Sequence, residues 1–122
     1  MEPAVQEGGG ECLFCRVIEK KIPSKIVYED ETAIAFEDIN PQAPVHLLII
    51  PKKHLSGLSA LQPADQGAIA HLFSVVSKLA QKNAIVEGGY RTVINTGRGA
   101  GQSVFHLHIH LLGGRPFRWP PG

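Results

Sequence analysis

Three histidines stand at alternate positions near the end of the chain, in the run His106-Leu107-His108-Ile109-His110. In an extended strand alternate side chains share a face, so we expect the three imidazoles on one face and the aliphatic residues on the other. Such a row suits the polar face of a half-exposed strand, a metal-chelating surface, or a set of nucleophiles and acid–base groups working near neutral pH. The spacing alone does not choose between these roles.

Other residues with chemical potential each allow two readings. His46 interrupts an apolar run at 45–50, so it is either a buried imidazole bonded to a carbonyl or a functional one. Asp38 has the carboxylate that ribose hydroxyls require, yet it equally suits a turn before Pro41. The Gly-rich stretch 96–102 is either an anion-binding loop or a connector, and it lacks the Lys-Ser/Thr ending of a Walker loop.

The apolar periodicity and the Pro/Gly punctuation predict the elements that position these groups. We expect an α+β domain in which a long helix packs on one face of a mostly antiparallel sheet of about five strands. His71 lies off the apolar stripe of that helix, where we expect it to be exposed. The predicted helices span 12–21 and 63–83, and the predicted strands span 25–28, 32–36, 45–50, 90–95 and 103–112.

Length and composition limit the domain organisation and the partners. We expect a disordered N-terminal tail at 1–11 and a single domain at 12–122, of which 114–122 form a proline-rich C-terminal tail. The 12 basic and 11 acidic residues nearly cancel, which predicts neither a nucleic-acid surface nor a membrane patch. The N-terminus resembles no signal or transit peptide, so we expect a cytoplasmic protein without a structural disulfide.

The run from His106 to Leu112 matches the signature of the histidine-triad (HIT) superfamily, in which three histidines alternate with hydrophobic residues. Residues 49–54, 101–104, 112–115 and 119–122 resemble its Hint branch, and the resemblance extends from about Leu13 to the C-terminus. It implies a HIT-like fold whose sheet continues across a two-fold homodimer.

The resemblance also implies an activity: hydrolysis of the P–N bond of purine nucleoside 5′-phosphoramidates, such as adenosine phosphoramidate, with no metal needed for catalysis. By this resemblance His108 is the nucleophile that forms a nucleotidyl-histidine intermediate. His110 and His46 bind phosphoryl oxygens, and Ser103 donates a hydrogen bond to the leaving nitrogen or bridges to phosphate. Neutral imidazole suits such covalent catalysis near neutral pH.

The nucleotide site implied by the resemblance has an apolar slot for the purine and a carboxylate for the ribose. In the Hint branch the C-terminal tail reaches the partner subunit's active site, which places Trp119 beside the leaving group. The other residues expected at the nucleotide are Leu13, Phe14, Val17, Ile22, Phe36, Asp38, Ile39, Asn95, Gly101, Gln102, Ser103 and Val104.

A Cys-x-x-Cys pair opens the predicted domain. In many bacterial Hint-like proteins this pair binds zinc with two histidines, and the matching residues here are Cys12, Cys15, His54 and His106. Two thiolates and two imidazoles would form a closed, structural zinc site. A redox pair and two incidental helix cysteines remain open, because other Hint members lack zinc.

Two rival functions also remain open. One is a dinucleoside polyphosphate hydrolase of the Fhit-like type, which the Gly-Gly-Arg at 113–115 and the Trp-Pro-Pro-Gly ending argue against. The other is a nucleotide-binding interaction module with vestigial hydrolysis, which the intact triad and Ser103 argue against.

Overall fold

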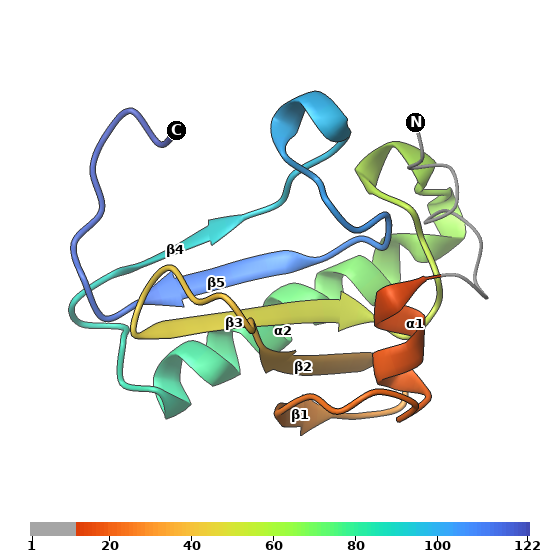
Figure 1. Cartoon of the computed structure of the whole chain (residues 1–122), viewed down its shortest axis with the longest axis horizontal. Helices are drawn as coiled ribbons and strands as arrows, with labels where there is room; N and C mark the ends of the chain where they lie inside the picture. Colours follow the sequence, from red (N-terminus) through yellow and green to blue (C-terminus); the bar gives the residue numbers. More distant parts are fainter. Residues whose placement is uncertain (1–11) are drawn as a thin grey trace.

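A computed structural model describes residues 12–122, and the tail expected at 1–11 lies outside the described residues. Five strands form one antiparallel sheet in the order β1-β2-β3-β5-β4, with α2 behind it and α1 beside the ends of β1–β3 (Figure 1). The expected α+β architecture is confirmed. The elements are α1 (Leu13–Ile18), β1 (Ile26–Glu29), β2 (Ala33–Glu37), β3 (Val45–Pro51), η3 (Leu58–Ala60), η4 (Pro63–Asp65), α2 (Gln66–Lys82), β4 (Tyr90–Val93), η5 (Arg98–Ala100) and β5 (Ile109–Gly113).

The long helix α2 covers one face of the sheet. Its buried stripe, which includes Leu72, Val76 and Leu79, packs in one cluster with Ile49 of β3 and Ile109 of β5. The helix begins at Gln66 rather than at the predicted Pro63, because 63–65 form a 3-10 turn closed by a capping box. Within residues 12–122, no helix combines the length and apolarity that crossing a membrane requires.

The short helix α1 covers the opposite face. Phe14 and Val17 are buried against Phe36 of β2 and Leu48 of β3. The helix ends at Ile18, three residues earlier than predicted, because Lys20 adopts a left-handed backbone conformation with φ 62°. This face carries the functional groups, since His46 and Leu48 alternate with residues that point toward α2.

The predicted histidine strand is shorter than expected. Only 109–113 form β5, while His106 and His108 lie in the irregular segment that leads into it. The ladder pairs Ile109 with Ile49, so its continuation would place Leu107 opposite Pro51, which has no N–H to donate. The predicted alternation of faces is nevertheless present: Leu107, Ile109 and Leu111 join the α2-side core, whereas Phe14 of α1 contacts His106 and His108.

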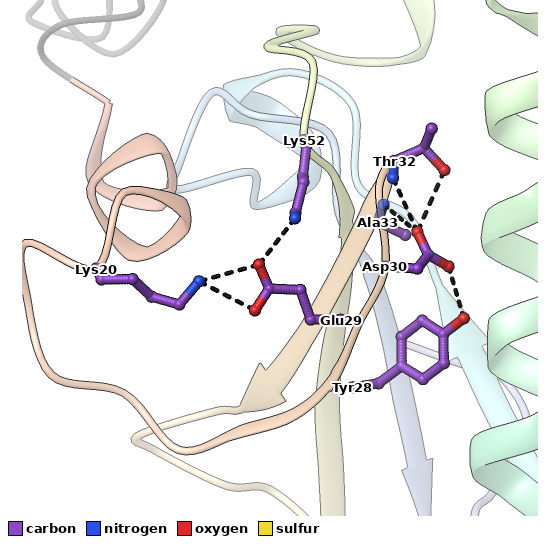
Figure 2. A network of polar contacts seen from close by, with 7 residues as sticks. All are labelled: Lys20, Tyr28, Glu29, Asp30, Thr32, Ala33 and Lys52. Atoms are coloured by element: carbon purple, nitrogen blue, oxygen red, sulfur yellow. Dashed lines mark hydrogen bonds and ion pairs between the residues drawn. The ribbon is translucent and has the colours of Figure 1, made fainter.

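The β1–β2 hairpin is closed by the Asp30 carboxylate, which accepts hydrogen bonds from the backbone N–H groups of Thr32 and Ala33, both at 2.8 Å (Figure 2). Next to it, Glu29 pairs with Lys20 (2.9 Å), which follows α1, and with Lys52 (2.8 Å), which follows β3. These contacts fix the ends of three elements that surround the site.

His71 corrects a prediction. It is half-buried on α2 rather than simply exposed, and its Nε2 donates a hydrogen bond of 2.6 Å to Oδ2 of Asp30. Tyr28 donates to the same oxygen, also at 2.6 Å. The hairpin is therefore bonded to the helix as well as packed on it.

Candidate active site

A cavity of about 320 Å³ opens between α1, the segment that precedes β1, and the histidine segment. Its wall combines apolar side chains with two carboxyl groups, two serine hydroxyls and two imidazoles. Most of the residues expected at the nucleotide line it. The lining residues are Leu13, Phe14, Val17, Ile22, Pro23, Ser24, Phe36, Glu37, Asp38, Ile39, Leu48, Ser103, Val104, His108 and His110.

His108 is buried, and its ring is fixed by the main chain. Its Nδ1 lies 2.7 Å from the carbonyl oxygen of His106. A carbonyl can only accept, so Nδ1 carries the proton and Nε2 of the neutral ring keeps its lone pair. Burial lowers the pKa of His108 below its usual value. Both effects favour the neutral, nucleophilic form of the imidazole.

His46 and His110 form a hydrogen-bonded pair with the opposite arrangement. The backbone N–H of Gln42 donates to Nδ1 of His46 at 3.0 Å, so the proton of neutral His46 is on Nε2. That Nε2 lies 3.0 Å from Nδ1 of His110, which therefore accepts and leaves its own Nε2–H as a donor. Burial lowers both pKa values, that of His110 to about 4 with help from the nearby His108 and His46.

Asp38 forms the expected turn and also faces the cavity. Its Oδ1 accepts from the backbone N–H of Asn40 at 2.8 Å, which forms a turn, and its carboxylate also lines the cavity. Its Oδ2 lies 3.4 Å from Nε2 of His46. A negative charge is thus present beside both the apolar slot and the histidine pair.

The residues expected to bind zinc form one cluster, with their ligand atoms all within 4.8 Å of one another. Nδ1 of His106 lies 3.4 Å from Sγ of Cys12 and 3.2 Å from Nδ1 of His54, and Cys15 Sγ lies 3.4 Å from His54 Nδ1. Zinc bonds of about 2.3 Å to sulfur and about 2.1 Å to nitrogen at tetrahedral angles place nitrogen about 3.6 Å from sulfur and about 3.4 Å from nitrogen. The four side chains therefore fit such an ion.

The surroundings of this tetrad agree with metal binding. Nε2 of His106 lies 2.8 Å from the carbonyl oxygen of Pro51, which places the proton there and leaves Nδ1 free as a ligand. Burial lowers the pKa of His106 to about 4, which keeps the ring neutral. Burial and the neighbouring Cys12 raise the pKa of Cys15 to about 12, a thiol that a cation would have to deprotonate on binding.

Four residues expected at the nucleotide lie outside the cavity wall of the described chain, so their contacts with a nucleotide remain predictions. Gln102 is buried and connects the 96–102 loop to Ser56. Its Oε1 accepts a hydrogen bond from the Gly97 N–H at 2.8 Å, and its Nε2 donates to the Ser56 carbonyl at 2.7 Å. Trp119 is 82% exposed in the C-terminal tail. The other two are Asn95, which follows β4, and Gly101, which ends η5.

The cavity also has wall residues that sequence reasoning missed: Pro23, Ser24, Glu37 and Leu48. The hydroxyl of Ser24 is buried without a hydrogen-bond partner among the described residues. No sequence motif includes these residues, and only the pairing register of β1 with β2 could have indicated their place on the cavity wall. Ile26 pairs with Phe36, so the residues just before β1 lie beside those just after β2.

The fold and the site define a small α+β protein with a row of histidines leading into a central strand of an antiparallel sheet. The chain belongs to the HIT family, since the HIT domain matches residues 19–117. It is 52% identical over 110 residues to an uncharacterized HIT-like protein of Synechocystis, covering 90% of this chain and 96% of that protein.

Solved structures agree with this assignment. A HIT family hydrolase from Legionella pneumophila superposes with a TM-score of 0.89 at 49% identity, covering 91% of this chain and 99% of the other. A histidine triad nucleotide-binding protein from Candida albicans superposes with a TM-score of 0.76 at 34% identity, covering 91% and 84%.

Proposed function

We propose that this protein is a hydrolase of the Hint branch, a purine nucleoside phosphoramidase. The observation that carries the proposal is the 2.7 Å contact between His108 Nδ1 and the His106 carbonyl, which leaves Nε2 as the free nitrogen of a ring on the cavity wall. Similar chains named as HIT family hydrolases and as a nucleotide-binding protein support it. Residues 112–115 and 119–122, which resemble the Hint branch, favour the P–N bond over a polyphosphate bond.

The proposed reaction has two displacements at phosphorus. In the first, Nε2 of His108 attacks the α-phosphorus, the P–N bond breaks, and the amine leaves with a proton. The cavity-lining hydroxyl of Ser103 is the proposed donor to that nitrogen. In the second, water breaks the bond between phosphorus and imidazole, which releases the nucleoside monophosphate and restores His108. Nε2–H of His110 stabilises the charge on the phosphoryl oxygens throughout.

The cavity provides the binding groups that this reaction needs. Phe14, Val17 and Phe36 form an apolar slot for a purine, and Asp38 accepts from the ribose hydroxyls. The proposed substrates are free nucleotides, and the proposal includes neither nucleic acids nor membranes as partners. We place the enzyme in the cytoplasm with its substrates.

The tetrad at 12, 15, 54 and 106 is the proposed holder of a structural zinc ion. Bound zinc would supply a rigid crosslink between α1, the segment after β3 and the segment before β5. Catalysis uses the histidines and needs no metal. We further propose a two-fold homodimer in which the exposed Trp119 of one tail reaches the partner's active site.

The decisive experiment is steady-state hydrolysis of a fluorogenic adenosine phosphoramidate by the wild type and by His108→Ala. We expect turnover by the wild type, a loss of at least about a thousandfold in the variant, and retained AMP binding in both. Diadenosine polyphosphate is the comparison substrate. Preferential cleavage of that compound would replace the proposal with a polyphosphate hydrolase, and AMP binding without any turnover would replace it with an interaction module.

A further inference from the structure

We propose that Arg115, on the C-terminal tail, is a positioning residue for His46 and His110 and acts on them through the peptide groups of Gln42. The inference deepens the proposed function, because it concerns the pair assigned to the phosphoryl oxygens. Arg115 does not line the cavity in the described chain, so it acts through other residues.

Three contacts fix the exposed Arg115 side chain. Its Nε donates to the carbonyl oxygen of Gln42 at 2.9 Å, and its Nη1 donates to the carbonyl oxygen of Pro116 at 2.9 Å. The guanidinium also lies 4.3 Å from the centroid of the Phe117 ring. A planar guanidinium already held by the Pro116 carbonyl and the Phe117 ring loses little further freedom on bonding to Gln42, which makes that contact effective.

Two glycines bring Arg115 to this place. A side chain at Gly113 would approach Ile85 to 2.7 Å, and one at Gly114 would approach Pro44 to 2.9 Å. Gly114 also has φ 93°, a conformation that other residues rarely adopt. Gly113 thus allows close packing on Ile85, whereas Gly114 lets the chain turn closely over Pro44 in the loop that contains Gln42. Arg115 is the first side chain after this turn.

From Gln42 the contacts continue into the site. The Gln42 carbonyl accepts from Arg115, while its N–H donates to Nδ1 of His46 at 3.0 Å. Nε2 of His46 donates in turn to Nδ1 of His110 at 3.0 Å. Each link affects the proton position of the next. The Gln42 N–H, together with the Asp38 carboxylate 3.4 Å from Nε2 of His46, makes His110 present a donor rather than a lone pair to the phosphoryl group.

Removing the Arg115 contact would free the loop at its outer side. The loop keeps the turn made by Asp38 and Asn40, but the Gln42 carbonyl loses its external partner, and the main chain that holds the Gln42 N–H against His46 is less firmly placed. His46 would then populate its other tautomer, which presents Nδ1–H and leaves Nε2 without a proton. In that state His110 has no donor from His46, and a share of molecules would direct a lone pair at negatively charged oxygen.

The test compares Arg115→Ala with Arg118→Ala. The second variant removes the same charge from the same tail, and the guanidinium of Arg118 makes no hydrogen bond, ion pair or ring contact within residues 12–122. We expect R115A to lower kcat about 3- to 10-fold with KM changed less than twofold, and R118A to stay within about twofold of the wild type. Equal effects of the two variants would overturn the inference.

A readout independent of catalysis is the nitrogen NMR spectrum of the histidine rings in the free protein. In the wild type we expect His46 and His110 protonated at Nε2 and His108 at Nδ1. R115A should shift His46 toward a tautomer mixture and leave His108 unchanged, whereas a general loss of structure would alter both. An unchanged His46 in a folded R115A protein would refute the positioning role, even if the enzyme cleaved no phosphoramidate.

A double-mutant cycle tests the route through Gln42. Gln42→Pro removes the N–H that contacts His46, and Gln42→Ala is its reference because it removes the same side chain and keeps the N–H. If Arg115 acts through the main chain of Gln42, R115A should cost activity in the Q42A background and less than about twofold in the Q42P background. Equal losses in both backgrounds would exclude the route. If Q42P fails to fold, the NMR comparison of R115A with R118A decides alone.

Discussion

The carbonyl oxygen of His106 lies 2.7 Å from Nδ1 of His108, so a single residue connects two sites. The His106 side chain belongs to the tetrad, with its Nδ1 3.4 Å from Sγ of Cys12. Its main chain fixes the ring that we propose as the nucleophile. A displacement of His106, whether by mutation or by loss of a ligand, must therefore also displace His108.

The pH dependence follows from the environment of His108. Burial lowers its pKa, while the His106 carbonyl and the charge of Asp38 act in the opposite direction. The net shift is downward, so the neutral nucleophile persists as the pH falls below the usual value of about 6.5. We expect the acid limb of kcat/KM to have its midpoint below about 6.5, measured from initial rates corrected for uncatalysed hydrolysis.

Asp38→Asn tests how the nearby charge affects the pKa of His108. Because the carboxylate raises the pKa of His108, its removal should move the acid limb to still lower pH. KM should rise in the same variant, since the proposed ribose contact is weakened. A midpoint at the usual histidine value, unmoved by D38N, would exclude His108 as the titrating group.

Metal removal is a second prediction. We expect about one zinc ion per chain, lost in Cys12→Ser/Cys15→Ser and retained in His71→Ala, which removes a histidine outside the tetrad. With free zinc a thousandfold above its Kd, chelation should lower the free energy of unfolding by about 4 kcal/mol. Metal analysis and thermal unfolding provide the measurement. A protein that purifies without metal and melts at the same temperature with added zinc or chelator would contradict the assignment.

The faces of the sheet were predictable from the sequence, but the strand ends were not. Alternation placed Leu107, Ile109 and Leu111 in the core even though β5 begins only at Ile109. Side chains alternate between two faces wherever the chain is extended. A β-strand requires, in addition, hydrogen bonds to a neighbouring strand. The missing partner is Pro51, and its position opposite Leu107 depends on a register that no local pattern reveals.

The candidate site was likewise predictable only in part. The sequence identifies His108, His110 and Asp38 as groups able to do chemistry, and the structure places all three on the cavity wall. Which nitrogen of His110 carries the proton does not follow from residue type, because it depends on Gln42 and His46, which are distant in the sequence. The hydrogen bonds of Gln102 were equally hidden from the sequence: one joins it to Gly97 of its own loop, and another to Ser56, 46 residues earlier.

Phe14 supports a third prediction. Its ring meets Phe36 edge-on at 5.3 Å between centroids and His108 edge-on at 5.1 Å. Phe14→Leu removes both contacts and part of the purine slot. We expect a loss of about 1–2 kcal/mol in the free energy of unfolding, together with a severalfold rise in KM.

The matched control is Phe73→Leu, the same substitution at a ring that is 45% exposed on α2. It should change stability by less than about 0.5 kcal/mol and leave KM unchanged. Denaturant unfolding and substrate titration measure both quantities. Equal KM values in F14L and F73L would show that Phe14 does not contribute to binding of the purine base.

The final prediction concerns Asp30, which joins the β1–β2 hairpin to α2. Burial would raise its pKa, but hydrogen bonds from Tyr28, His71 and two backbone N–H groups together lower it below the usual 3.8. A carboxyl group whose pKa is lower in the folded than in the unfolded protein stabilises the fold at pH values above the unfolded pKa. This contribution is lost as the pH falls from the unfolded pKa toward the folded pKa.

Asp30→Asn should therefore lower the free energy of unfolding by about 1–2 kcal/mol at neutral pH. The difference from the wild type should shrink below about pH 4, as followed by unfolding at several pH values. Glu31→Gln, the same kind of substitution at the adjacent exposed position, is the matched control. A D30N deficit that stays constant down to about pH 2 would show that Asp30 contributes by shape rather than by charge.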